Sequence, residues 1–361
     1  MTEQCSTLEL EVLPLANGTA RLVRVYGETP CVLLPDALPA PEGGSFVLTE
    51  LGDYCFSEKP RSLPPYAELC RYRVDGTGEV RLLCAFGQSL SARRYDLDFG
   101  DGAPPVEELP VICGNFLEEV VLPGSLAVIG SCAFYNCRKL RRITVGAGGL
   151  TLGSDVFLNC FALETIVVQA APDQPTGAFV LVNSITEAVR LVFAPQQEPL
   201  AALWYPAYWE DIEETPAHIL LHTFSGQGYH YRQCFLNYKF LPAEYDGVFP
   251  QGHDADDANI MAMLCFERLR YPWQLAPTAA EAYRAFLAQN TGRVLARLLK
   301  AQDLEGIRAL LALDVMEKAA FAEGAALAAK ADNASAAALL ADAEYQKYAA
   351  SKRPKRYDFD F

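Results

Sequence analysis

Two histidines spaced four residues apart are the first side chains in this sequence that could support chemistry. His218 and His222 would share one face of a helix, and His230 follows, so imidazole ligands for zinc are at hand. A zincin-type site needs glutamate directly after the first histidine as the general base, and this chain has Ile219 there. Because residues 219–221 are all apolar, we expect this segment to be buried in a core or a strand. The sequence therefore predicts no metal ligand and no cofactor.

Other reaction-bearing patterns are equally incomplete. The acidic string from His253 to Asp257 offers oxygen ligands but lacks the glycine and terminal glutamate of a calcium loop. The start of a helix explains these carboxylates better, because negative charge is favoured there. We find no nucleophile elbow, no phosphate-binding loop and no dinucleotide-binding glycine motif. We expect a protein that is not an enzyme and has no catalytic residue, and we keep a cryptic enzyme in residues 200–275 as a third hypothesis.

Cysteines recur in the chain, and their number does not fit a disulfide framework. The sequence has 11 of them at irregular spacing, so we expect reduced thiols in the core of an intracellular protein. Cys137 and Cys160 hold equivalent places in a repeat, described next, whose strands would lie roughly 4.8 Å apart. Whether these two thiols ever pair stays open.

One eight-residue phrase occurs twice, 23 residues apart. Gly130-Ser-Cys-Ala-Phe-Tyr-Asn-Cys137 is echoed by Gly153-Ser-Asp-Val-Phe-Leu-Asn-Cys160. A fixed period of this length is typical of a solenoid, in which each unit buries its apolar side only by stacking on its neighbours. The period therefore favours binding to a partner over chemistry.

The run that follows each phrase alternates like a β-strand. Leu140, Ile143 and Val145 should point inward, and Arg142 and Thr144 outward. Related runs stand at Leu117–Leu122, Leu163–Val168 and, more loosely, Val189–Phe193. We expect the outward side chains to form an exposed strand face that binds a partner protein. Its predicted members are Glu119, Val121, Arg142, Thr144, Thr165 and Val167.

The pattern Ile-Gly-x-x-Ala-Phe-x-x-Cys at Ile129–Cys137 resembles the BspA-like leucine-rich repeats of bacteria. The resemblance covers roughly residues 8–195, with an opening repeat at 20–57, and departs from the family in residues 58–108. That departure holds two apolar runs around Asp75–Gly78 and predicts an inserted β-hairpin. The family implies an α/β solenoid of short parallel strands over residues 1–198. By analogy it also supports an alternative role in glycan binding or surface adhesion.

The sequence changes character after residue 198. Residues 199–277 are rich in aromatics, and Trp204, Tyr205, Tyr208 and Trp209 would either cover the last coil or form an exposed platform for sugars or proteins. We favour a connecting and capping segment. Residues 278–350 predict an all-helical module similar to ankyrin repeats in outline, although the Thr-Pro-Leu-His turn is missing. Residues 351–361 predict a flexible tail.

Local signals place several helix starts in this half. The periodicity predicts a helix from Asp257 to Leu269. Thr278, with Glu281 three residues later, predicts a capping box. Asp303 and Asp314 are placed as further N-caps.

Overall composition limits the class of partner. The chain of 361 residues has a formal net charge of −15, which disfavours nucleic acids and anionic membranes because like charges repel. No apolar run is long enough to insert into a membrane, and residues 1–5 carry no signal-peptide pattern. The sequence thus predicts a cytoplasmic, non-enzymatic interaction scaffold with an unknown protein partner, and glycan binding stays open.

Overall fold

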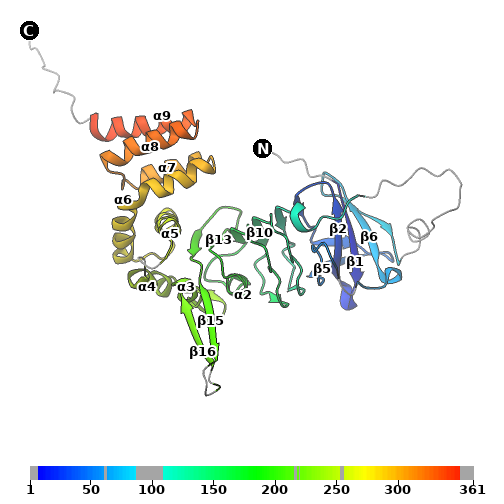
Figure 1. Cartoon of the computed structure of the whole chain (residues 1–361). Helices are drawn as coiled ribbons and strands as arrows, with labels where there is room; N and C mark the ends of the chain where they lie inside the picture. The colour runs from blue at the N-terminus through cyan, green and yellow to red at the C-terminus, as the bar shows by residue number, and fades with distance from the viewer. Residues whose placement is uncertain are drawn as a thin grey trace, which may run out of the picture. The chain divides into compact units, whose positions relative to one another are not determined.

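The computed structural model describes residues 7–60, 63–86, 109–214, 218, 220–252 and 256–349. The chain divides into two compact units. The first comprises Met1–Leu200, Ala207–Trp209 and Arg232–Leu241. The second comprises Ala201–Pro206, Glu210–Tyr231 and Pro242–Phe361. Figure 1 labels many of their elements, and each unit is described by itself.

A parallel ladder of short strands forms the centre of the first unit. Its strands are β3 (Cys31–Leu33), β8 (Glu119–Val121), β10 (Arg142–Val145), β12 (Thr165–Val168) and β13 (Val189–Phe193). Each strand pairs in parallel with the next, in the order given. The register aligns Val120, Ile143, Ile166 and Leu191, all at most 1% exposed, so the apolar alternation in the sequence forms the core of the solenoid.

A second sheet begins the first unit and combines parallel and antiparallel pairing. Its strands are β1 (Leu8–Pro14), β2 (Thr19–Gly27), β4 (Ala37–Pro39), β5 (Ser45–Leu51), β6 (Cys70–Val74), β7 (Val80–Cys84), β9 (Val128–Ile129) and β11 (Thr151–Leu152). The coil strands β5, β9 and β11 pair in parallel, whereas β1 pairs antiparallel with β2 and with β6. The solenoid therefore starts from an antiparallel sheet.

The expected hairpin in residues 58–108 is present, but it extends that sheet instead of standing apart from it. β6 and β7 pair antiparallel, and β6 also pairs with β1. The turn between them is closed by Asp75, whose carboxylate accepts the backbone N–H groups of Thr77 and Glu79 at 2.9 and 3.0 Å. Residues 87–108 lie outside the described part of the chain.

The opening repeat expected at residues 20–57 differs from a regular coil in its first third, although β2 does pair in parallel with the coil strand β5. β2 pairs antiparallel with β1, a pairing that a solenoid coil does not make. The remainder behaves as a coil, because β3 aligns in parallel with β8 and Phe56 stacks on Phe134 of the next coil. The sequence did not reveal this difference because β2 has the same alternating apolar pattern as a coil strand.

The repeated phrase packs side chain on side chain along the solenoid. The rings of Phe56, Phe134 and Phe157 are stacked, with centroids 5.2 and 5.5 Å apart and planes within 10°. The Cys137 and Cys160 thiols donate to the backbone oxygens of Phe56 and Phe134, one coil earlier, at 3.3 and 3.0 Å. These contacts explain why phenylalanine and cysteine recur at fixed places.

Asparagine and glycine recur for backbone reasons. Asn136 and Asn159 have φ of 63° and 65°, a left-handed conformation that asparagine tolerates well. The Asn159 Nδ2 group donates to Asn136 Oδ1 at 2.7 Å. At Gly153 an added Cβ would lie 2.4 Å from the backbone nitrogen of Ser131, so the coils approach too closely for any other residue.

The second unit is mainly helical around one largely buried helix. Helix α5 (Ala258–Arg270) packs against the strand β14 (Ala201–Tyr205) and against α6 (Pro277–Lys300). Ten consecutive residues of α5, from Ile260 to Leu269, are buried. Among them is Arg268, whose guanidinium donates to both carboxylate oxygens of Asp246 at 2.9 and 2.8 Å. This unit therefore has a polar cluster in its core that the apolar face of α5 did not predict.

The remaining elements are short and complete the two units. The other helices are α2 (Ala178–Asn183), α3 (Gly228–Arg232), α4 (Pro242–Gly252), α7 (Leu304–Ala312), α8 (Lys318–Lys330) and α9 (Ala334–Glu344). Single turns lie at Ala16–Gly18, Tyr66–Glu68, Gly114–Phe116 and Tyr345–Ala349. The other strands are β15 (Trp209–Glu214), β16 (Leu220–Ser225), β17 (Phe235–Leu236) and β18 (Lys239–Phe240).

Helix starts test the capping predictions. Asp257 and Asp303 are N-caps, since their side chains accept the N–H groups of Asn259 and Gly306. The capping box at Thr278 is wrong, because Pro277 already occupies the first helical turn and Ala276 is the N-cap. Asp314 is also wrong as an N-cap, because α8 begins only after Glu317.

Candidate partner-binding face

The outward side chains of the parallel ladder form two rows that run across the strands. We call the row Glu119, Arg142, Thr165 and Arg190 the charged row, and the row Leu33, Val121, Thr144, Val167 and Val192 the apolar row. The members of each row are register partners on neighbouring strands, which lie about 4.8 Å apart. Together the two rows define the strand face, which includes all six residues predicted from the sequence.

Exposure separates the two rows. Glu119 and Arg142 are exposed and Thr165 is half-buried, whereas Thr144 and Val167 are only 7% and 5% exposed. The prediction that Thr144 and Val167 are open to a partner is therefore wrong. Each stands between two register partners, and side chains at strand spacing cover one another's flanks.

The charged row carries both signs of charge side by side. Glu119 and Arg142 are register partners across β8 and β10, and Thr165 separates Arg142 from Arg190 on the other side. In the apolar row, Leu33 is 50% exposed and Val121 half-buried, so apolar contact is available at the β3 end. The strand face thus offers charges of both signs beside an apolar strip, a composition suited to binding another protein.

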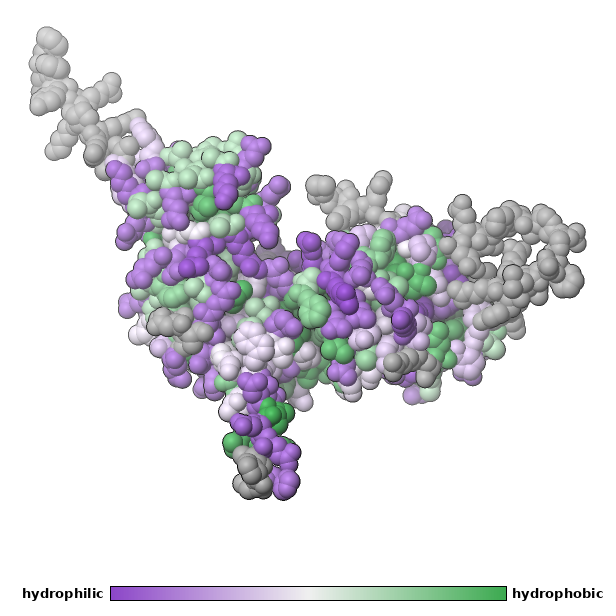
Figure 2. Space-filling view, in the orientation of Figure 1, coloured by the Kyte–Doolittle hydropathy of each residue, from purple (hydrophilic) through white to green (hydrophobic). Residues whose placement is uncertain are grey.

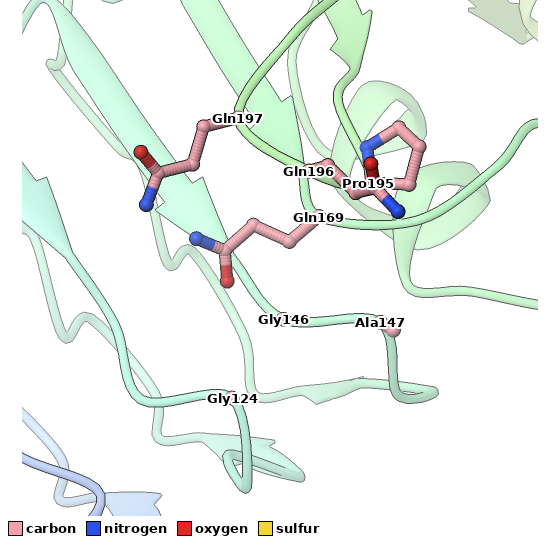
Figure 3. Close-up of a pocket in the computed structure, with 7 residues that line it drawn as sticks. All are labelled: Gly124, Gly146, Ala147, Gln169, Pro195, Gln196 and Gln197. Carbon is pink, nitrogen blue, oxygen red and sulfur yellow. The ribbon is translucent and has the colours of Figure 1, made fainter. Parts of the chain in front are cut away.

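A groove opens at the carboxyl ends of the same strands (Figure 3). It has a volume of about 510 Å³ and is lined by Gly124, Gly146, Ala147, Gln169, Pro195, Gln196 and Gln197. These residues follow β8, β10, β12 and β13 in turn. Figure 3 shows the carboxamide ends of Gln169 and Gln197 directed toward one another. We call this feature the carboxamide groove.

Two glycines shape the floor of the carboxamide groove. A Cβ added to Gly146 would lie 2.5 Å from the backbone oxygen of Gly124, so the two coils meet backbone to backbone. The Gly124 N–H donates to the Asp36 carboxylate at 2.7 Å. The lining has no ionisable side chain, and its glutamines both donate and accept hydrogen bonds.

The cysteines of the repeats are poorly suited to nucleophilic chemistry. Burial raises the pKa of the Cys160 thiol to about 12, and the pKa of Cys55 is likewise raised to about 12 by burial. Burial also raises the pKa of Cys137 far above its ordinary value. A thiol reacts as the thiolate, so these groups stay protonated and inert at neutral pH.

Residues 220–225 of the histidine segment form the strand β16, and a strand was one of the two settings that we expected, but the described side chains are not buried. Leu220 and Leu221 are 58% and 47% exposed, because among the described strands β16 pairs only with β15. His218 lies 2.6 Å from the Glu214 carboxylate, and its side chain is 88% exposed. Within the described residues, no group of three His, Cys, Asp or Glu side chains could hold a metal ion.

The aromatic residues expected to cap or to form a platform fall into two groups. Trp204 and Tyr205 are at most 2% exposed. The Arg297 guanidinium lies 4.6 Å over the Trp204 ring, and the Tyr245 hydroxyl donates to the Trp204 carbonyl. These two rings are therefore core groups of the second unit, whereas Trp209 is 67% exposed.

Sequence reasoning missed the carboxamide groove and the polar cluster around Arg268. The groove had a visible signal, since glycine, glutamine or proline follows each of β8, β10, β12 and β13. The cluster had none, because Asp246, Arg268 and Tyr283 are far apart in the chain. Their contact is nevertheless close, with the Tyr283 hydroxyl donating to Asp246 at 2.8 Å.

The stacked coils and the open strand face define a leucine-rich-repeat solenoid. Residues 113–189 match the model of the BspA type Leucine rich repeat region, in 6 copies. That part of the chain is a BspA-type leucine-rich repeat region, as the recurring phrase predicted. The helical region that follows is also confirmed.

Comparison with other proteins gives little beyond this. A solved structure of a leucine rich cell surface protein from Faecalibacterium prausnitzii A2-165 is similar over 44% of this chain, at 15% identity and a TM-score of 0.24. The match spans 35% of that protein. No curated protein matches the chain. In the part of the chain that the structure describes, no helix is both long and apolar enough to cross a membrane.

Proposed function

We propose that the chain is a non-enzymatic scaffold that binds a partner protein through the strand face. The observation that carries this proposal is the strict register of the charged row across β8, β10, β12 and β13. Register spaces its side chains evenly on a rigid surface, so little order is lost when a partner binds. The coarser statement, a protein of the leucine-rich-repeat class with an interaction or surface role, rests on the family match.

The inert thiols of the repeats support a binding role over catalysis. The exposed members Glu119 and Arg142, with half-buried Val121 and Thr165, are the residues that we propose touch the partner. Thr144 and Val167 are buried between their register partners in the apolar row and hold the strands that carry these residues in place.

The test is affinity capture from the native host's lysate with a double charge substitution. Arg142→Glu/Thr165→Glu should lose the partner, because three carboxylates would then follow one another along the charged row, at positions 119, 142 and 165. Arg138→Glu/Thr151→Glu is the matched control, since it changes the same residue types at exposed positions in the same repeats, away from the ladder. Retention of the partner by the first variant would remove the strand face as the contact surface.

The carboxamide groove favours a second candidate function, binding of a neutral glycan. Its uncharged lining of glutamine side chains and glycine backbone matches hydroxyl groups, which also both donate and accept. Gln169→Leu should abolish binding to an array of neutral oligosaccharides. The exposed Gln174→Leu, in the same coil, should not. An array with no bound sugar would exclude this function.

We further propose a location in the cytoplasm and a separate role for the helical module at residues 278–350. Support for the first is that the Cys137 and Cys160 thiols serve as hydrogen-bond donors in the core, a role that requires them to stay reduced. Support for the second is that α8 packs on α9 and α6 on α8, a stacking of helices that ankyrin-like modules use. Residues 199–277 would then connect and cap the repeats. Alkylation and mass measurement of protein taken from its host would test the thiol state.

A further inference from the structure

The strands β15 and β16 form a two-stranded sheet that no other strand of the described residues joins. Figure 1 shows this ribbon extending away from the helices of its unit. All six side chains of β15 are exposed, and so is each described side chain of β16. A hairpin of this kind is at best marginally stable in water. Its outer edges present backbone groups that can pair with another strand.

The ribbon has apolar side chains on both faces. Ile212 and Leu220 are each 58% exposed and Leu221 is 47% exposed. Since successive side chains of a strand point to opposite faces, Leu220 and Leu221 cannot be on the same side. Figure 2 shows hydrophobic and hydrophilic side chains intermixed on the described part of the ribbon. Each face of the ribbon therefore exposes apolar side chains to solvent.

The charge of the ribbon has one sign. β15 has four carboxylates in six residues, at Glu210, Asp211, Glu213 and Glu214. The sequence contains no lysine or arginine between Arg190 and Arg232. This charge excludes a second copy of the chain as the occupant, because two such ribbons would bring eight carboxylates together. Nucleic acids and anionic membranes are excluded for the same reason.

We propose that the β15–β16 ribbon is a docking site for an extended, lysine- or arginine-rich segment of a partner protein, which joins the ribbon as an added strand. Backbone hydrogen bonds would come from the open edge, as in other cases of strand addition. Alternate cationic side chains would face the carboxylates of β15. Their aliphatic stems would cover apolar side chains such as Ile212 and Leu220. This surface is separate from the strand face and does not depend on it.

The test uses the full chain and a fluorescein-labelled ten-residue peptide of alternating valine and lysine, followed by fluorescence anisotropy. Asp211→Lys/Glu213→Lys should weaken binding at least about tenfold, because it removes two exposed ion pairs and replaces them with repulsion. Glu68→Lys/Glu281→Lys changes the net charge equally at exposed sites elsewhere and should leave affinity within about twofold. Equal loss in both variants would mean general electrostatic attraction and would overturn the proposal.

Two further measurements distinguish docking at the edge of the ribbon from misfolding and from binding without backbone pairing. Asp211→Asn/Glu213→Asn adds no cation and should show an intermediate loss, with an unchanged circular dichroism spectrum. Full affinity for this neutral variant would contradict the charge argument. A peptide N-methylated at alternate residues keeps its charge but cannot form the added ladder, so it should bind at least about tenfold more weakly. Equal binding of the methylated peptide would overturn strand addition.

Discussion

The ring stack inside the solenoid gives the sharpest stability prediction. Phe134 is fully buried and has a stacked ring on each side, Phe56 at 5.2 Å and Phe157 at 5.5 Å. Phe157 is 8% exposed and stacks on Phe134. The two residues have the same volume and equivalent places in the repeat. Their replacement by leucine therefore removes the same atoms but a different number of ring pairs.

An aromatic pair contributes about 0.5–1.5 kcal/mol beyond its buried area. Phe134→Leu removes two pairs and should lower the free energy of unfolding by about 1–3 kcal/mol from stacking. Phe157→Leu removes one pair, or about 0.5–1.5 kcal/mol. The cavity terms are similar and largely cancel in the comparison. We expect the first substitution to be about twice as destabilising as the second.

Native-state hydrogen exchange at the amides of Ile143 and Ile166 measures this difference within the solenoid itself. Both residues are in the core row of the ladder and are fully buried. Phe266→Leu in the second unit is the control and should leave exchange at these two amides unchanged. An equal or larger effect of Phe157→Leu would refute the argument that a continuous ring stack stabilises the coils.

Three further predictions concern a buried thiol, a buried ion pair and a close contact between coils. Burial raises the pKa of Cys160 from 9.0 to about 12, so between these pH values the folded chain keeps a proton that the unfolded chain loses. The free energy of unfolding should therefore fall between pH 9 and 12 by up to about 1.4 kcal/mol per pH unit. Urea unfolding of the wild type and of Cys160→Ala should differ by this pH-dependent contribution. Asp246→Ala should destabilise the second unit by about 3–5 kcal/mol, because it leaves buried Arg268 without its carboxylate partner. A decrease of less than about 1 kcal/mol in the free energy of thermal unfolding would contradict a structural role for the pair. Gly153→Ala should prevent normal stacking, because its Cβ would lie 2.4 Å from the Ser131 nitrogen, and an unchanged melting temperature would show that the coils can separate at no cost.

The sequence predicted the solenoid well because its repeats act locally. Phe134 and Phe157 recur 23 residues apart, and the same period brings them into contact. The alternation around Ile143 likewise predicted which side chains are in the core. Antiparallel pairing of β2 with β1 was not predictable, because alternation is the same in either pairing.

The sequence predicted which residues of the strand face lie on the outward side of the strands, but it did not predict how exposed each of them is. Periodicity shows which side of a strand a residue occupies, and it placed Thr144 and Val167 outward. It does not show how closely neighbouring side chains cover them, which depends on the stacking of whole coils. The apolar residues at 219–221 were expected to be buried in a core or a strand for a related reason, since the sequence does not reveal that β16 pairs with β15 alone among the described strands.

The central claim is that the strand face binds the partner, and the most direct measurement is the affinity of the captured, purified partner for three forms of the full chain. The wild type and Arg138→Glu/Thr151→Glu should have dissociation constants within about twofold of each other. Arg142→Glu/Thr165→Glu should bind at least about tenfold more weakly, which corresponds to about 1.4 kcal/mol of binding free energy. Equal affinity for all three forms would contradict the assignment of partner binding to the strand face.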